Sequence, residues 1–341
     1  MKSPHGLRTI AAAIVLGLSL AWLPLPAGAA NGVAMTAAQT GLQKSLEVLA
    51  QRARPGLLGV AILDLKTGAQ ARVNASQAYP MMSVFKAPVA AAVFAQIDEG
   101  RLSLKQHVTL TRADLRSGSA VPSIGGNFRG EHMTFTVEQL LIAAVSESDN
   151  TAADALVKLA GGPPAVTAFL RSHGIDGMRV DLDEAGVGRV FEGLRSGEGI
   201  SPTESSQEAH QRLRRGYEAF LADPRNRSTP DAAIEFLRQL WKGELLPPSS
   251  AQRLLRLMDG QTVPNRLRAG LPNGVHLADK CGTSDSLDGV TAAYNDIGVL
   301  TSSDGHTVLV AAFLTASRAS KAERNATFAD LTRSIAAALH P

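Results

Sequence analysis

The chain has 341 residues, of which 45% are apolar and 19% are charged, and its formal net charge at pH 7 is +3. This composition is typical of a soluble globular protein that buries a sizeable core in one large domain or two interleaved domains. The only cysteine, Cys281, excludes an internal disulfide. Basic residues cluster at 211–215 without interleaved aromatic residues or a nucleic-acid motif, so the cluster indicates a solvated helix face and excludes a nucleic-acid partner.

The first thirty residues have the three parts of a secretory signal peptide. A basic segment precedes an apolar run at 10–23, and small residues follow at 27–30. The apolar run is about fourteen residues long, which is short of the roughly 20 residues that span a bilayer. We therefore predict cleavage near Ala29 or Ala30, export to the periplasm or the medium, and no membrane anchor after cleavage.

Hydrophobic periodicity predicts the elements that follow. Leucines at helical spacing predict a helix over 36–54, and the apolar, β-branched stretch 57–65 with the turn after it predicts a hairpin. Helical patterns then continue to about residue 260, at 84–97, 136–145, 151–159 and 231–240. Strands return at 275–278, 290–300 and 307–315, and a last helix is predicted at 321–339.

An early hairpin and late strands predict one antiparallel sheet whose halves are separated in sequence by a helical insertion. We therefore predict an α/β fold with an antiparallel sheet flanked by helices, and an all-helical domain beside it. The expected boundaries are 1–30 for the signal peptide, 36–85 with 261–341 for a discontinuous α/β domain, and 86–260 for the helical domain. An extended loop is expected within the helical domain at about 181–228.

Ser83 and Lys86 are three residues apart at the start of an apolar helix, which places the hydroxyl and the amine on one face. A serine needs a base to become a good nucleophile, and a lysine with a lowered pKa can accept its proton. The helix N-terminus also favours negative charge near Ser83. Taken alone, this spacing is more typical of a capping serine and a solvated lysine.

Ser148 and Asn150, in the motif Ser-Asp-Asn, lie between two predicted helices. A second serine can relay a proton to a leaving nitrogen, and an asparagine amide offers a donor and an acceptor to a substrate amide. Taken alone, the motif is more typical of a helix cap.

The motif Lys-Cys-Gly-Thr at 280–283 follows a predicted strand. Lys280 could hold a carboxylate, and Gly282 would let a ligand approach the backbone so that the next N–H donates into an oxyanion hole. The alternative is an ordinary strand end with an exposed lysine.

Together these motifs have the order found in class A β-lactamases and penicillin-binding proteins. The chain resembles the class A serine β-lactamases over most of its mature length, and further similar segments lie at 151–154, 223–225, 229–230, 243–246 and 271–272. The resemblance implies that Ser83 is acylated, that Lys86 is its general base or proton relay, and that Ser148 protonates the β-lactam nitrogen. It also implies that Asn150 binds the substrate side-chain amide, and that the backbone N–H groups of Ser83 and Thr283 form the oxyanion hole.

The resemblance further implies that Lys280 and Thr283 bind the substrate carboxylate. Arg266 is the candidate for an additional carboxylate-binding arginine, and Arg324 is its rival. Cys281 stands where the family usually has serine or threonine. Because a thiol is a weaker donor than a hydroxyl, the carboxylate would be held less tightly, although a small residue that merely fills the same space is the favoured alternative.

In this family a glutamate activates the water that hydrolyses the acyl-enzyme. The matching residue is Glu184, with Asp183 and Glu192 as rivals. The surrounding loop departs from the family. Gly188 replaces a common asparagine, and about thirty extra residues separate Glu184 from the segment 223–225.

The same loop also lacks its usual closing charge pair, since Leu182 and Asn226 occupy the two matching positions. The geometry of the loop therefore stays open at this stage.

Three functions compete. The resemblance implies a monomeric β-lactamase that hydrolyses β-lactam antibiotics through Ser83 and Glu184. A D-Ala-D-Ala peptidase or other penicillin-binding protein would lack the glutamate, and a β-lactam sensor that stays acylated would need a membrane-spanning transducer. We expect no cofactor and no metal, because the histidines form neither an H-E-x-x-H nor an H-x-x-E-H cluster.

Overall fold

An antiparallel sheet forms the centre of the computed structural model, which describes residues 1, 37–195 and 197–339. Within these residues the sheet has six strands in the order β2-β1-β10-β9-β7, and β8 pairs with the end of β9. The strands are β1 Leu57–Asp64, β2 Gln70–Val73, β7 Val275–Thr283, β8 Ser286–Leu287, β9 Val290–Ser302 and β10 Thr307–Ser317. The prediction of one antiparallel sheet built from early and late segments is therefore confirmed.

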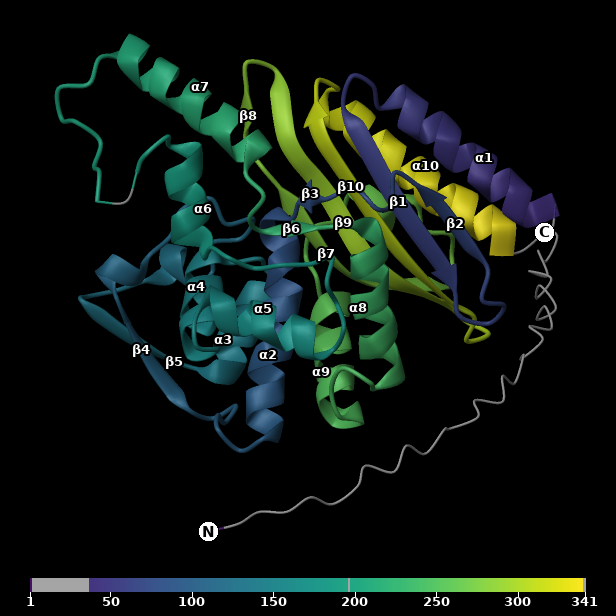
Figure 1. The fold of residues 1–341 in the computed structure, drawn as a ribbon, viewed down its shortest axis with the longest axis horizontal. Helices are drawn as coiled ribbons and strands as arrows, with labels where there is room; N and C mark the ends of the chain where they lie inside the picture. The colour runs from purple at the N-terminus through teal and green to yellow at the C-terminus, as the bar shows by residue number, and fades with distance from the viewer. Residues whose placement is uncertain (2–36, 196, 340–341) are drawn as a thin grey trace. The chain divides into compact units, whose positions relative to one another are not determined.

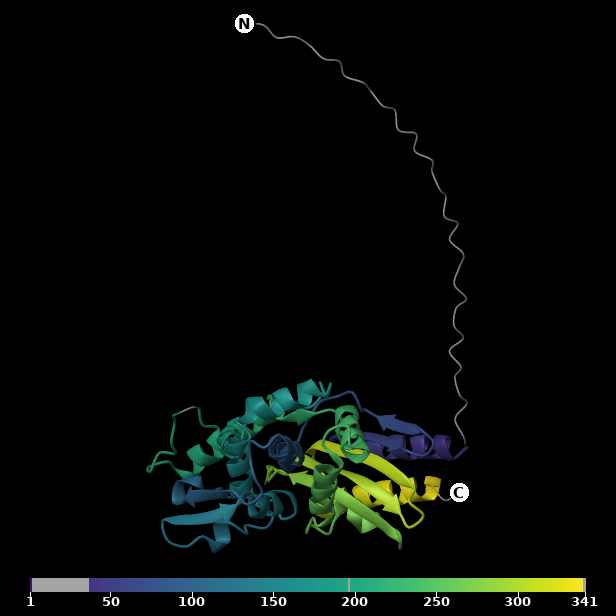
Figure 2. The same ribbon diagram turned by 90° about the horizontal axis from the view of Figure 1, so that it is seen from below.

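Helices cover both faces of this sheet (Figures 1 and 2). One face carries α1 Ala37–Arg52 and α10 Lys321–Leu339, and the other carries α2 Lys86–Asp98, α8 Pro230–Lys242 and α9 Pro248–Asp259. The central strand β10 shows why both faces are covered. Its alternate residues Val308 and Val310 pack with α1 and α10, whereas Leu309 and Ala311 pack in the core shared with α2 and α8. Since both sets are apolar, the sequence of β10 shows no alternation.

The segment between the two halves of the sheet is mainly helical. It contains the helices α3 Val137–Val145, α4 Asn150–Leu159, α5 Pro163–Ser172, α6 Glu184–Phe191 and α7 Ser206–Ala222. It also contains a hairpin of β4 His107–Thr111 and β5 His132–Thr136, which the sequence analysis did not foresee. Two residues of β3 Tyr79–Pro80 pair with β6 Arg227–Ser228.

The stretch expected as an extended loop, 181–228, holds the helices α6 and α7. Helix α7 is rich in charged residues, but Leu213, Tyr217 and Phe220 recur at i, i+4 and i+7 and make one apolar face. Tyr217 and Phe220 are buried against α6 and the sheet edge. This single narrow stripe is easily missed among the surrounding glycine, serine and arginine residues.

Helix starts fix several of these positions. Thr229 caps α8 by accepting a hydrogen bond from the Ala232 N–H, with Pro230 in the first turn. Asp149 caps α4 in the same way through the Ala152 N–H. The predicted signal peptide and its cleavage site lie outside the described residues. Across 37–195 and 197–339, no helix has both the length and the apolar character needed to cross a membrane.

Candidate active site

Ser83 lies in the 3-10 turn η1 Met82–Phe85, directly before α2, and Lys86 is the first residue of that helix. The turn has no side-chain cap, so Ser83 is not a capping serine. Lys86 is almost completely buried, with 1% of its surface exposed, so it is not a solvated lysine either. Met82, just before Ser83, has a φ of 46°, a left-handed conformation that is costly for a side chain with a Cβ. The structure therefore does not agree with the alternative of a capping serine and a solvated lysine.

The Lys86 ammonium is surrounded by acceptors from two distant segments. Its Nζ lies 2.8 Å from the Ser148 carbonyl, 2.6 Å from Asn150 Oδ1 and 3.4 Å from Ser148 Oγ. Glu184 Oε1 is also close, at 3.0 Å, and both side chains are buried. This contact is an ion pair by distance but is poorly aligned, so Oε1 has no hydrogen-bond donor among the described residues. One amine thus joins the serine turn, the Ser-Asp-Asn motif and Glu184.

Ser148 lies between two lysines. Its Oγ accepts a hydrogen bond from Lys280 Nζ at 3.0 Å, opposite the 3.4 Å contact with Lys86. Ser148 has a φ of 60°, a left-handed conformation that is uncommon for a residue with a side chain. Lys280 is fully buried rather than exposed at a strand end. Burial lowers the pKa of Lys280 to about 8, and the charge of the nearby Lys86 acts in the same direction.

Asn150 opens α4 and is tied on three sides. Its amide N–H₂ donates to the Ser117 carbonyl at 2.7 Å, its backbone N–H donates to Ser119 Oγ at 2.8 Å, and its Oδ1 accepts from Lys86. The amide therefore contacts the segment at 117–119 as well as Lys86.

Glu184 is the first residue of α6, and its backbone is held by an acid that the sequence analysis did not select. Asp154 on α4 accepts hydrogen bonds from the backbone N–H of Glu184 at 2.6 Å and of Ala185 at 3.2 Å. Arg116 Nε donates to the same carboxylate at 2.6 Å. Burial and the neighbouring Asp183 nevertheless raise the pKa of Asp154 to about 6.

The two rivals of Glu184 lie elsewhere. Asp183 uses its carboxylate to cap α6 through the Gly186 N–H at 2.8 Å. Glu192 is eight residues further on, at the end of the same helix. Of the three acids, Glu184 is therefore the one whose carboxylate contacts Lys86.

Strand β7 passes directly beside the serine turn because residue 282 has no side chain. A Cβ added at Gly282 would lie 2.4 Å from the Met81 carbonyl and 3.0 Å from the Ser83 nitrogen. Asn295 on β9 reinforces this approach, since its Nδ2 donates to the carbonyls of Pro80 and Met81 at 2.8 and 3.0 Å. Strand β7 at Gly282, one residue before Thr283, therefore lies against the backbone at Ser83.

Arg266, in the turn η4 Arg266–Gly270, reaches the end of β7. Its guanidinium donates to Thr283 Oγ1 and stacks over the Tyr294 ring at 4.2 Å from the ring centroid. Arg266 is 3% exposed, and its Nε has no partner among the described residues. Its rival Arg324 also covers Tyr294, at 5.2 Å, but bonds the Ala319 carbonyl. Arg266 is therefore the arginine in contact with Thr283.

Cys281 is buried, and its Sγ accepts a hydrogen bond from Gln261 Nε2 at 3.3 Å. The same amide donates to Asp279 at 2.9 Å, and Arg268 Nε also donates to Asp279 at 2.6 Å. Asp279 and Asp296 are both fully buried, and burial raises both of their pKa values. Asp279 lies on the same strand as Lys280 and Asp296 lies on the neighbouring β9, and neither carboxyl group was anticipated from the sequence.

The two ends of the 181–226 segment, which we call its neck, are joined by the side-chain amide of Asn226 instead of by an ion pair. Asn226 Oδ1 accepts from the backbone N–H of Asp181 and Leu182 at 2.7 and 2.8 Å, and its Nδ2 donates to the Leu182 carbonyl at 2.9 Å. The Asn226 carbonyl in turn accepts from the Met81 N–H at 2.9 Å. The absence of the usual charge pair therefore leaves the neck fully bonded.

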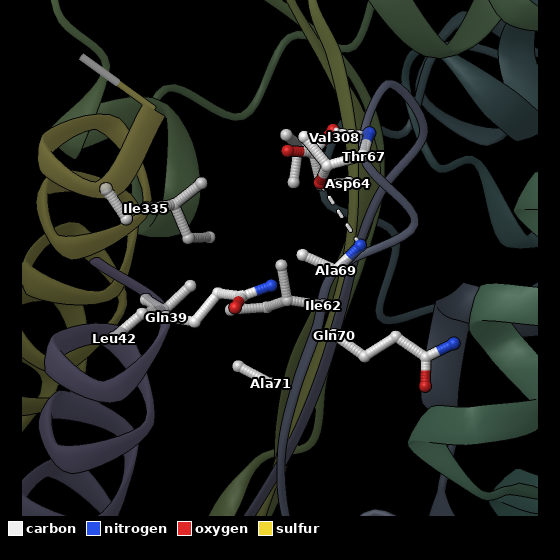
Figure 3. A pocket seen from close by; sticks show the side chains of 11 residues that line it. Gln39, Leu42, Ile62, Asp64, Thr67, Ala69, Gln70, Ala71, Val308 and Ile335 are labelled. Carbon is white, nitrogen blue, oxygen red and sulfur yellow. Dashed lines mark hydrogen bonds between the residues drawn. The ribbon is translucent and has the colours of Figure 1, made fainter. Parts of the chain in front are cut away.

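A cavity of about 580 Å³ opens beside these groups and is lined by Asn150, Glu184 and Thr283 together with residues of α6 and α7. Figure 3 shows a different cavity, of about 160 Å³, where Leu42 of α1 and Ile335 of α10 face Ile62 and Ala71 of the β1–β2 hairpin. Most of its lining is apolar, and it contains none of the motif residues. Within the described part of the chain, no group of three His, Cys, Asp or Glu side chains could hold a metal ion.

Comparisons with known proteins agree on one family. A model of the Beta-lactamase enzyme family matches residues 41–339. Beta-lactamase VEB-1 of Pseudomonas aeruginosa is 30% identical over 273 residues, covering 78% of this chain and 80% of the relative. Beta-lactamase L2 of Stenotrophomonas maltophilia is 32% identical over 290 residues, with coverages of 85% and 82%.

Solved structures give the same result. A β-lactamase from Chitinophaga pinensis DSM 2588 superimposes with a TM-score of 0.73 and 31% identity, covering 87% of this chain and 98% of that one. An ancestral class A β-lactamase of Gram-negative bacteria gives a TM-score of 0.69 and 32% identity, with coverages of 86% and 98%.

Proposed function

The chain belongs to the class A serine β-lactamase family, and from this premise we propose that it hydrolyses β-lactam antibiotics through an acyl-enzyme on Ser83, with deacylation assisted by Glu184. The observation that carries the proposal is the position of the Lys86 amine, which lies within 3.4 Å of Ser148 Oγ and 3.0 Å of Glu184 Oε1. We therefore assign Lys86 as the one proton-transferring group that serves the attack by Ser83, the protonation of the ring nitrogen through Ser148, and the deacylation with Glu184.

In acylation, the Ser83 hydroxyl oxygen attacks the lactam carbonyl carbon, and its proton passes to Lys86. Lys86 can accept that proton only after giving one up, because an ammonium group has no free electron pair. Glu184 is the base within reach for this first transfer. We therefore assign Glu184 the role of general base through Lys86 in acylation.

The carbonyl oxygen becomes an oxyanion when the hydroxyl attacks. The backbone N–H groups of Ser83 and Thr283 are the donors we assign to it, which is supported by the close approach of Gly282 to the serine turn. When the C–N bond breaks, the ring nitrogen takes a proton from Ser148 Oγ. Lys86 then returns a proton to Ser148 and recovers its own from Glu184.

The β-lactam carboxylate is the group we assign to Lys280, Thr283 and Arg266. Lys280 supplies a charge next to Ser148, and Arg266 adds a second positive charge through its contact with Thr283. Cys281 is buried against Gln261, which supports the interpretation that its small side chain only fills space and does not hold the substrate carboxylate.

In deacylation, Glu184 accepts a proton from a water molecule as its oxygen attacks the acyl carbon, and Ser83 leaves with a proton from Lys86. The environment of Glu184 Oε1 supports this assignment, because the buried oxygen has Lys86 Nζ at 3.0 Å but no aligned hydrogen-bond donor among the described residues. Asp154 holds the backbone of Glu184 and is assigned the role of a positioning residue.

The test is turnover of a chromogenic cephalosporin by the purified chain, with intact-mass detection of adducts. We expect sustained turnover by the unmodified chain, and no turnover and no adduct for Ser83→Ala. For Glu184→Gln we expect acylation to be slowed, because the base for Lys86 is lost, and hydrolysis to be slowed more strongly, so that an acyl adduct accumulates. A stable stoichiometric adduct on the unmodified chain without turnover would instead assign a penicillin-binding protein or a sensor.

We also propose that the chain is exported, on the basis of its first thirty residues. N-terminal sequencing of the protein recovered from the periplasm tests this, with a new N-terminus expected near residue 30. Recovery of the full-length chain from the cytoplasm alone would contradict it.

A further inference from the structure

We propose that helix α7 forms one wall of an apolar subsite that receives an aromatic acyl side chain of the β-lactam. The inference rests on the proposed function and adds the class of substrate that the site prefers. It is carried by the shape of the cavity beside Glu184 and by the contacts that hold α7 in place.

The cavity of about 580 Å³ is lined by the proposed catalytic residues Asn150, Glu184 and Thr283 and by an apolar group of side chains. The apolar group comes from α6, α7 and β8 and consists of Val187, Phe191, Leu213, Tyr217 and Leu287. The charged residues Arg189, Glu192 and Asp285 also line the cavity, so the apolar group is one part of a mixed lining.

One face of α6 carries both Glu184 and residues of the apolar group. Glu184, Val187, Gly188 and Phe191 stand at positions i, i+3, i+4 and i+7, so they follow each other along the same side of the helix. Gly188 lines the cavity, and a Cβ added there would meet nothing within 4 Å. The space between Glu184 and Phe191 on this face is therefore open.

Contacts on two sides hold helix α7 in place, one with α6 and one with the sheet. Toward α6, Gly216 allows backbone contact, since an added Cβ would lie 2.4 Å from the Phe191 carbonyl. Toward the sheet, Tyr217 Oη lies 2.5 Å from the Val290 carbonyl and 3.1 Å from the Asp285 carbonyl. Arg214 adds an exposed ion pair with Asp288 at 2.8 Å, which contributes little by itself. Figure 1 shows α7 reaching from α6 to β8.

The chemistry of the wall favours a flat apolar group. Phe191 stacks on Phe220 at 4.0 Å between ring centroids and lies 5.7 Å from the Tyr217 ring, so the wall is partly aromatic. A substrate that acylates Ser83 and binds its side-chain amide at Asn150 carries the rest of that side chain beyond the amide. Asn150 and Phe191 line the same cavity, so a phenyl group of that side chain placed against Phe191 would gain aromatic contacts.

The experiment compares two penicillins that differ only in the acyl side chain, 6-acetamidopenicillanic acid and benzylpenicillin. The variant Leu213→Ala shortens the α7 wall, and Glu218→Ala is the control, because Glu218 is exposed on the same helix. We expect Leu213→Ala to lower kcat/KM for benzylpenicillin by about tenfold or more, with a change within twofold for the acetamido compound. Glu218→Ala should leave both values within twofold.

An equal fall for both substrates would overturn the proposal, because α7 would then act on the fold or on catalysis. No change for either substrate would overturn it as well. Hydrolysis of the acetamido compound by the unmodified chain reports the proposed function separately. If that hydrolysis is absent, the same comparison between the variants is made on acylation. Intact mass then measures the rate at which each penicillin acylates Ser83.

Discussion

The carboxylate of Asp154 should make the stability of this protein depend on pH in an unusual direction. Burial raises its pKa from 3.8 to about 6, although Arg116 and two backbone N–H groups oppose this. A carboxyl group whose folded-state pKa is raised binds more protons in the folded chain than in the unfolded chain between these values. Its contribution to stability is therefore lost as the pH rises from about 4 to above 6.

The magnitude follows from the size of the change. One pKa unit corresponds to about 1.4 kcal/mol, so keeping Asp154 ionised costs the folded state about 3 kcal/mol above pH 6. Asp154→Asn carries no charge at any pH. Relative to the unmodified chain, it should gain up to about 3 kcal/mol in stability between pH 4 and pH 7.5. Because Oδ2 accepts from both the Ala185 N–H and Arg116 Nε, the substitution also lowers the stability by about 2 kcal/mol at both pH values.

Urea unfolding of both proteins at pH 4 and pH 7.5 measures this difference, since other titrating groups are shared and cancel. Asp176→Asn is the control, because that carboxylate is 83% exposed, and its effect should be the same at both pH values. If Asp154→Asn instead loses stability relative to the unmodified chain as the pH rises, Arg116 and the two N–H groups dominate. The reasoning from burial would then be refuted.

Three further predictions concern β7. Gly282→Ala should lower turnover by at least about 100-fold with an unchanged circular dichroism spectrum, because its Cβ would meet the backbone at Met81 and Ser83; turnover near the unmodified level would disprove the proposed oxyanion hole. Above pH 8, kcat/KM should fall as Lys280 loses its proton, and Lys280→Arg should move that fall to higher pH; a flat profile from pH 7 to 9 would contradict this. Cys281 should react with a thiol reagent only after unfolding, because it is buried; modification of the folded protein would show that β7 opens.

Local patterns were sufficient to predict much of this molecule. The antiparallel sheet followed from apolar, β-branched stretches at both ends of the chain, and α8 followed from the helical pattern at 231–240, since such patterns depend on neighbouring residues. Helix α7 and the β4–β5 hairpin were missed. Their apolar stripes are short, and they are stabilised by contacts with distant segments.

The sequence by itself determined the set of reactive groups, because each of the motifs around Ser83, Ser148 and Lys280 consists of residues only a few positions apart. The tertiary structure alone decided how these groups meet. Lys86 touches residues that lie 62 and 98 positions further along the chain, and Asp154 holds Glu184 across 30 positions. Such contacts, and the burial that shifts the pKa values of Asp154 and Lys280, depend on long-range packing, which no local spacing encodes.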